Sequence, residues 1–297
     1  MRTEPIAGIP VARTRHWGRL LTAAVALAII GWLAFLVVVN PRLDWSQVAV
    51  YLFDGRILSG VWVTIEISVL ATVLGLVLGL VIAIMRLAHN PVLSRLALLY
   101  IWFFRGTPVL VQLIFWYNLA FLFPELVLKI PFTMIGLKWD TNEVMTGFTS
   151  AMLGLGLNLA AYFAETVRAG IQAVDKGQTE AAYALGMTPA KRMRVIVLPQ
   201  ALRIIIPPTG NEFISMLKTT SLVYVVAGRD LMTISSQIYK ANNLIMELLI
   251  VASLWYMLMT AVATFLQGRL ERRFGSEAVR LVRGGGLAGR ILPKVAA

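Results

Sequence analysis

Residues 178–201 read QTEAAYALGMTPAKRMRVIVLPQA, and they form the only long polar, basic connection in a chain that otherwise consists of apolar runs. Thr188 is a good N-cap residue, and Pro189 suits the first helical position, because the N–H that proline lacks has no helical partner there. Gly186 can take the left-handed conformation that ends a helix. The stretch therefore predicts two short helices that meet at a tight corner.

The first of these helices has the composition of a docking surface. Alanine side chains let a partner approach closely, and Glu180, expected at the N-terminal end of the helix, is favourable there and can also pair across an interface. The candidate docking residues are Glu180, Ala181, Ala182, Leu185, Gly186, Leu198 and Pro199.

The composition is that of a membrane protein. Of the 297 residues, 58% are hydrophobic and only 14% are charged, whereas soluble domains carry about a quarter charged residues. Several apolar runs reach about 20 residues, which is enough for a helix to cross a bilayer core. They lack the alternation of membrane-spanning strands. We therefore expect an all-α polytopic membrane protein.

Six transmembrane helices are expected in chain order. They are Leu20–Val39, Gly60–Met85, a run from Leu96 to Phe123 in which the span starts near Thr107-Pro108, Thr146–Arg168, Arg203–Ala227 and Leu248–Leu266. Leu96–Phe104 is either an interfacial helix or the bent first part of the third span. Residues 124–145 and 228–247 are expected as loops, Pro207-Pro208 as a break in the fifth span, and residues from 267 onward as a basic tail. Gly75 and Gly79, four residues apart, predict close contact between helices.

Basic residues indicate the orientation. The formal net charge is +12, which would also suit nucleic-acid binding. Of the 27 lysines and arginines, however, twenty lie on the side that holds both termini and residues 176–203, and six lie on the other side. Because cytoplasmic loops are enriched in lysine and arginine, we expect both termini and the docking stretch in the cytoplasm, and no nucleic-acid partner.

Metal and nucleotide chemistry have no support in the sequence. There is no cysteine, and His16 and His89 lie far apart without ligand-spaced partners, so no metal site is expected. A G-x-x-x-x-G-K-[ST] phosphate loop is missing from the sequence. We expect no cofactor and no enzymatic activity in the chain itself.

Ionisable groups at membrane depth are costly and mark candidate path residues. Lys218 is the deepest, and it either lines a polar path or is paired or snorkelling. Asn211 and Glu212 are weaker candidates on the same helix, and Glu66 either meets a substrate ammonium or pairs with a basic side chain. For Glu165 and Arg168, three residues apart, a local ion pair is the favoured interpretation.

The pattern Glu180-Ala181-Ala182, Gly186, Leu198-Pro199 resembles the EAA loop with which bacterial ABC-importer permeases dock their ATPase subunits. From about Gly60 to the last span, the chain is similar to the polar amino-acid branch of these permeases, the histidine/glutamine/arginine/opine-type family. This resemblance is carried by Arg105-Gly106-Thr107-Pro108, Ala161-Tyr162 with Glu165 and Arg168, Gly177-Gln178, and Lys218-Thr219-Thr220-Ser221-Leu222.

The resemblance implies a type I ABC importer permease in a bacterial inner membrane. Its expected partners are ABC ATPase subunits, a second permease subunit that is identical or different, an extracytoplasmic binding protein and a polar amino acid. Residues 60–267 would form the permease domain with the docking loop at 176–203. Residues 1–59 would add a cytoplasmic segment, an extra helix and a short outer loop, and residues 268–297 a basic tail.

Two other classes compete with this interpretation. A self-sufficient secondary transporter or channel would use the same polar helix but needs no docking loop, and such transporters often show related halves, which this sequence does not. A membrane scaffold or signalling subunit would leave Lys218, Glu212 and Glu66 without a purpose at depth.

Overall fold

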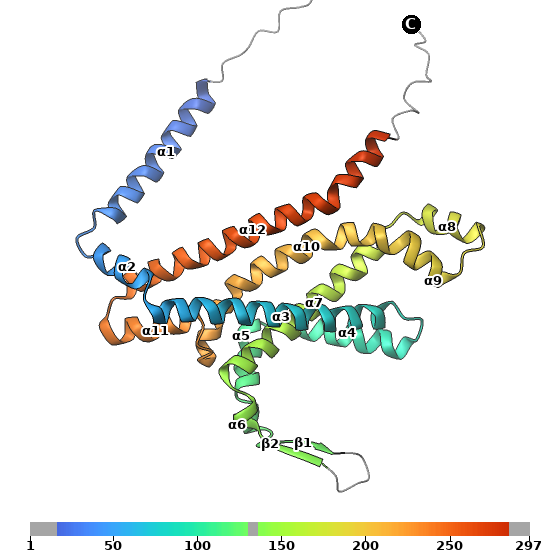
Figure 1. The fold of residues 1–297 in the computed structure, drawn as a ribbon, viewed down its shortest axis with the longest axis horizontal. Helices are drawn as coiled ribbons and strands as arrows, with labels where there is room; N and C mark the ends of the chain where they lie inside the picture. The colour runs from blue at the N-terminus through green and yellow to red at the C-terminus, as the bar shows by residue number, and fades with distance from the viewer. Residues whose placement is uncertain (1–16, 130–135, 285–297) are drawn as a thin grey trace, which may run out of the picture. The chain divides into compact units, whose positions relative to one another are not determined.

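The computed structural model describes residues 17–129 and 136–284, and within these ranges the chain is mostly helical. It divides into two compact units, residues 1–47 and 48–297. The predicted segment before Trp17 and residues 285–297 of the predicted tail lie outside the described residues. Figure 1 shows the elements with their labels.

Helix α1 (Trp17–Val38) is the main described element of the first unit. Its apolar side chains are exposed along its length, Leu27 to 69% and Ile30 to 63%. An exposed apolar helix of this length suits a lipid environment. The span predicted at Leu20–Val39 is confirmed as a candidate membrane helix.

The second unit holds the remaining elements. In chain order they are α2 (Trp45–Leu52), α3 (Gly55–Leu87), α4 (Pro91–Gly106), α5 (Val109–Tyr117), the 3-10 helix η1 (Leu119–Phe121), β1 (Glu125–Lys129), β2 (Gly136–Asp140), α6 (Thr141–Val144), α7 (Gly147–Gln172), α8 (Lys176–Ala184), α9 (Pro189–Arg192), the π-helix η2 (Met193–Val197), α10 (Leu198–Thr219), the 3-10 helix η3 (Thr220–Val226), α11 (Leu231–Asn242) and α12 (Ile245–Gly284).

Helices α3 and α7 pack in parallel at the centre of this unit through small residues. A Cβ atom on Gly75 would lie 2.8 Å from the Cβ of Leu159, and one on Gly79 would lie 2.7 Å from the carbonyl oxygen of Ala160. Because both positions lack a side chain, the two backbones approach closely. The helix contact predicted from Gly75 and Gly79 is confirmed.

The number of spans differs from the prediction. By length and composition, four described helices can cross a membrane: α1, α3, α7 and residues 245–272 of α12. Helices α4 and α5, bent by 100°, make a fifth if the pair is one broken span. The predicted number of six is not confirmed. Helix α10 has 22 residues, but its prolines and its polar and charged residues lower its hydropathy, and it is not among these candidates.

Two predicted loops contain regular structure. Residues 124–145 include an antiparallel hairpin of β1 and β2, in which Glu125 lies opposite Asp140. Residues 228–247 include the 12-residue helix α11. The prediction that these segments lack regular structure was wrong. Their strands and helix are short and polar, so they give a weaker sequence signal than the long apolar runs. Helix α12 also continues through Gly284, into residues predicted as tail.

The predicted break at Pro207-Pro208 is also wrong, since α10 is a continuous helix with both prolines inside it. Proline fixes φ near the helical value, so a helix can continue through it while losing hydrogen bonds. Polar contacts from α12 support this region. The Gln267 Nε2–H group donates to the carbonyl of Pro207 at 3.2 Å and to Oδ1 of Asn211 at 3.1 Å.

A buried polar contact attaches α11 to α3, at the end of the unit opposite α8 and α9 (Figure 1). The Leu231 N–H donates to Oγ1 of Thr64 at 3.0 Å, and the fully buried Asp230 caps α11 by accepting from the Met232 N–H at 2.9 Å. A capped helix end leaves fewer buried N–H groups without a partner. The contact therefore holds α11 against the first half of α3.

Candidate functional site

The docking stretch folds into the helix–turn–helix that its sequence predicts. Helix α8 ends at Ala184, and Gly186 follows with a φ of +71°. The Gly186 N–H donates to the Tyr183 carbonyl and the Met187 N–H donates to the Ala182 carbonyl. This paired pattern is the Schellman ending, which favours glycine at the left-handed position. Thr188 then caps α9, and Pro189 is its first residue. The predicted roles of Gly186, Thr188 and Pro189 in the backbone are confirmed.

Glu180 lies elsewhere on α8 than expected. The helix begins at Lys176 and is capped by Asp175, so Glu180 is in its second turn. The prediction of Glu180 at the helix N-terminus was wrong, because the carboxylate of Asp175 takes the capping position. An effect of the helix dipole falls off within the first turn, so it does not stabilise Glu180, which is exposed.

Two large, exposed side chains follow this glutamate in the chain. Tyr183, three residues on, is 74% exposed and Leu185 is 82% exposed, while Ala182 is buried. Glu180 and Tyr183 are also on the rim of a hollow of about 440 Å³, which is completed by Ile171, Thr179, Arg192, Met193 and Val197. Exposed large apolar side chains beside a charge are typical of a protein–protein contact surface.

Leu198 and Pro199 begin α10, directly after the π-helix η2. The Leu198 N–H bonds to the Met193 carbonyl, five residues back. Pro199 has no N–H to give to the Val195 carbonyl, and π-helical turns often occur at functional sites. The docking helices thus connect to α10 through an irregular turn.

A second candidate site lies where α4 and α5 meet. Pro108 cannot donate to the Phe104 carbonyl, so the helix ends at Gly106 and restarts at Val109. Side chains replace the missing donor: Nε2 of Gln112 donates to the Phe104 carbonyl at 3.0 Å, and Nδ2 of Asn158 donates to it at 2.9 Å. The break therefore forms a fixed corner and not a flexible joint.

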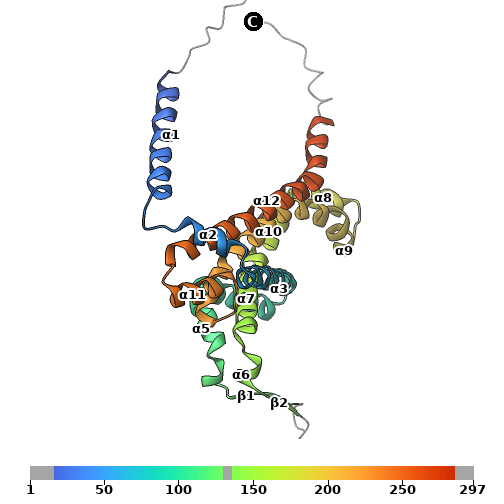
Figure 2. The same cartoon turned by 60° about the vertical axis from the view of Figure 1, so that its left-hand side comes forward.

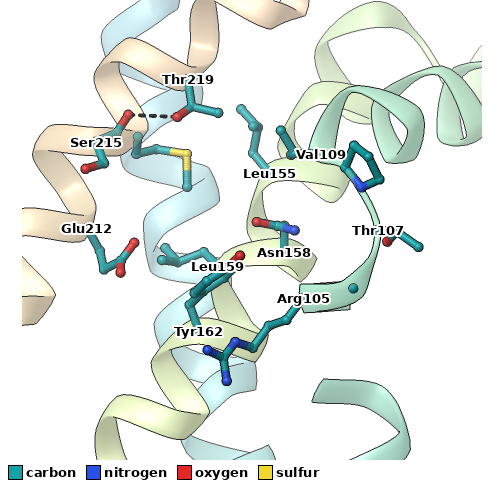
Figure 3. A pocket seen from close by; sticks show the side chains of 13 residues that line it. Arg105, Thr107, Val109, Leu155, Asn158, Leu159, Tyr162, Glu212, Ser215 and Thr219 are labelled. Atoms are coloured by element: carbon teal, nitrogen blue, oxygen red, sulfur yellow. Dashed lines mark hydrogen bonds between the residues drawn. The ribbon is translucent and has the colours of Figure 1, made fainter. Parts of the chain in front are cut away.

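This corner, α7 and α10 enclose a cavity of about 510 Å³, which we call the pathway pocket (Figure 3). Its volume is in the range of small-molecule sites, about 300–1,000 Å³. Its lining residues are Arg105, Gly106, Thr107, Pro108 and Val109 at the corner, Leu155, Asn158, Leu159 and Tyr162 on α7, and Glu212, Ser215, Met216 and Thr219 on α10.

The pathway pocket holds two opposite charges that do not pair within the described chain. The guanidinium carbon of Arg105 lies 5.1 Å from the ring centroid of Tyr162, a cation–π contact. Glu212 is half-buried and faces the pocket from α10. Among the described residues, no ion pair within 4.0 Å involves either group. Both charges are thus available to a ligand.

Of the predicted path residues, the structure brings only Glu212 into this pocket. Lys218 is exposed in the last turn of α10, Asn211 contacts Gln267 of α12, and Glu66 is exposed on α3. On α10, Glu212, Ser215 and Thr219 share one face, since residues three, four and seven apart align on a helix. Lys218 points elsewhere on the same turn.

As candidates for the path, sequence reasoning missed the other polar lining residues, Arg105, Thr107, Asn158, Tyr162, Ser215 and Thr219. A signal existed for some of them. Arg105 precedes the Gly106-Thr107-Pro108 break, and Ser215 and Thr219 follow Glu212 at helical spacing. Asn158 gave no signal, because its role is to contact a carbonyl 54 residues away.

Comparison with known proteins decides the family. Residues 75–276 match the model of a family described as binding-protein-dependent transport system inner membrane component. The chain belongs to this family. It is a multi-pass membrane permease subunit of an ABC importer, so a binding protein and an ATPase are its partners in transport.

Individual relatives support the same family assignment. The permease is 42% identical to the arginine transport system permease protein ArgU of Corynebacterium glutamicum over 283 residues, 93% of this chain and 85% of the relative. It is 32% identical to the glutamine transport system permease protein GlnP of Escherichia coli K12 over 232 residues, 78% of this chain and 98% of the relative. The predicted family is confirmed.

Solved structures show the same fold. A crystal structure of an amino acid ABC transporter with histidines matches the permease with a TM-score of 0.67 at 36% identity, covering 78% of this chain and 99% of that one. An inward-facing structure of the MetNI methionine ABC transporter matches with a TM-score of 0.60 at 18% identity, over 74% of this chain and 96% of that one, and shows the fold alone. The predicted type I importer fold is confirmed.

Proposed function

We propose that this permease forms the pathway for uptake of a polar amino acid, which an extracytoplasmic binding protein delivers and a separate ATPase drives inward. The observation that carries the proposal is the pair of unpaired charges in one pocket. An amino acid is a zwitterion, so its carboxylate suits Arg105 and its ammonium or a cationic side chain suits Glu212.

Two further observations support the substrate class. ArgU is named for arginine and GlnP for glutamine. Asn158, Tyr162 and Thr219 add polar groups beside the charges, while Leu155 and Leu159 supply an apolar wall. Polar groups that fix the orientation of a ligand beside an apolar wall are typical of small-ligand sites.

The ATPase would dock on residues 176–203 from the cytoplasmic side. The exposed Glu180, Tyr183 and Leu185 would form the contact surface, and the excess of lysine and arginine on this side supports an orientation with this stretch and both termini in the cytoplasm. The protein would lie in a bacterial inner membrane and pair with a second permease subunit.

The test is reconstitution in proteoliposomes with the cognate ATPase and binding protein. We expect ATP-dependent uptake of one of arginine, histidine, glutamine or glutamate, and Glu212→Gln is expected to weaken amino-acid binding about tenfold by removing a charged hydrogen bond. The matched control is Glu66→Gln, because Glu66 is exposed outside the pathway pocket.

Two outcomes would contradict the proposal. Uptake by the permease alone, driven by an ion gradient and without ATP, would favour a secondary transporter. ATP hydrolysis without uptake of any amino acid would exclude the substrate class while leaving the family assignment intact.

A further inference from the structure

A second hollow, of about 560 Å³, adjoins the pathway pocket and shares Arg105, Gly106 and Tyr162 with it. We call it the arginine hollow. Its lining residues are Arg86 at the end of α3, Leu98, Ile101, Trp102, Arg105 and Gly106 on α4, and Tyr162, Glu165 and Arg168 on α7. The shared residues make the two cavities neighbours along α7.

The arginine hollow has an excess of positive charge, with three arginines and a single glutamate in its lining. Glu165 is engaged by Arg168, whose Nε and Nη2 lie 2.9 and 2.7 Å from Oε2 of the carboxylate. Arg86 and Arg105 also lie close enough to act electrostatically on Glu165. One carboxylate cannot neutralise three guanidinium groups, so the hollow attracts an anion.

Hydrogen-bond donors without a partner also favour a bound anion in the arginine hollow. The Nε atom of Arg86 is buried and has no hydrogen-bond partner among the described residues, although Nη1 of Arg86 donates to Oγ of Ser94 at 2.8 Å. Among the described residues, Arg105 also forms no ion pair with a carboxylate. A buried donor without an acceptor is costly, and an anion in the hollow would supply the acceptor.

The position of the hollow suggests which anion it takes. Tyr162, Glu165 and Arg168 follow one another at helical spacing on α7, and six residues of helix advance about 9 Å. Arg86 lies in the last turn of α3, and Arg168 lies four residues before the end of α7, the helix that leads into the docking helices. The hollow therefore extends from the pathway pocket toward the docking side.

We propose that the arginine hollow is an inner carboxylate-binding site, which receives the transported amino acid after it leaves the pathway pocket. Arg105 borders both cavities, so the substrate carboxylate passes from Arg105 to Arg168 and Arg86. Glu165 competes for Arg168 and keeps the inner site from holding the substrate too tightly. This inference rests on the proposed function.

The experiment uses the complete complex with its ATPase and binding protein, and it measures uptake in proteoliposomes and labelled amino acid bound per complex at a fixed concentration. Arg86→Gln and Arg168→Gln are expected to slow uptake about tenfold and to lower the bound amount. Glu165→Gln is expected to slow uptake as well but to raise the bound amount, because Arg168 is then free for the carboxylate. Arg168→Lys, which keeps the charge, should restore most of the uptake.

Arg95→Gln is the matched control, because Arg95 is exposed on α4 outside both cavities. The inference is overturned if Arg95→Gln has the same effect, or if the Arg86 and Arg168 variants transport and bind like the unaltered protein. It is also overturned if their defect follows the phosphatidylglycerol content of the vesicles with no change in bound amino acid, since the hollow would then hold a lipid headgroup. If the unaltered complex itself neither binds nor imports an amino acid, the proposed function has failed instead.

Discussion

Gly60 has no side chain, and this allows α3 to pack closely against the backbone of α11. A Cβ atom there would lie 2.9 Å from the Cα of Leu231 and 3.2 Å from its backbone nitrogen. These are backbone atoms, which cannot rotate away as a side chain can. The contact lies beside the hydrogen bond from Leu231 to Thr64, so the strain of a larger residue would fall on the attachment of α11.

Gly60→Ala is therefore expected to destabilise the permease by about 1–3 kcal/mol, the usual cost of overpacking. The measurement is the thermal unfolding midpoint of the purified protein. Gly55→Ala, in the same helix, is the control, because a Cβ on Gly55 would meet nothing within 4 Å. Equal midpoints for the two variants would show that α11 moves freely against α3.

At the scale of the element, the corner between α4 and α5 depends on one buried amide. Gln112 is only 4% exposed, and its Nε2 donates to the carbonyls of Phe104 and Thr107 and to Oγ1 of Thr107. These groups lie at the chain break that Pro108 creates. The amide thus replaces backbone hydrogen bonds that the proline removes.

Gln112→Leu keeps the approximate volume but leaves these acceptors with fewer donors, so a loss of about 1–3 kcal/mol is expected. Thermal unfolding measures it, and amino-acid binding should weaken as well, because Thr107 and Pro108 line the pathway pocket. Gln237→Leu, at an exposed position of α11, should change neither quantity. Unaltered stability of Gln112→Leu would mean that Asn158 alone supports the corner.

At the scale of the whole molecule, one helix connects the docking helices to the pathway pocket. The docking helices α8 and α9 lie at one end and α11 at the other (Figure 2 gives a second view). Helix α10 begins directly after the docking helices and carries Glu212, Ser215 and Thr219 into the pathway pocket. A displacement of α8 and α9 can therefore be transmitted to the pathway pocket along the backbone of α10.

Glu180→Lys tests this coupling, because it reverses an exposed charge on the proposed docking surface. Like charges placed across an interface cost several kcal/mol, so uptake by the complete complex should fall about tenfold or more while the unfolding midpoint is unchanged. Glu143→Lys, exposed on α6 beside the hairpin, is the control. Normal ATP-driven uptake by the Glu180 variant would contradict docking at α8.

Much of this protein follows from local sequence. Apolar runs long enough to cross a bilayer predicted α1, α3 and α7 within five residues and the start of α12 within three, since burial of such runs in lipid outweighs other preferences. They did not predict the polar continuation of α12 to Gly284. Gly186, Thr188 and Pro189 predicted the corner of the docking stretch, because their backbone preferences act over only a few residues. The docking motif likewise indicated the family.

The tertiary structure alone decided which side chains meet. The 100° bend between α4 and α5 places Arg105 in the lining of the pathway pocket, and the rotation of α10 directs Glu212 into the same pocket while leaving Lys218 exposed. Glu165 and Arg168 formed the expected local pair, yet their place in the arginine hollow depends on Arg86 from another helix. Helix rotation and crossing are set by packing between segments far apart in the chain, and a spacing rule within one helix carries no information about them.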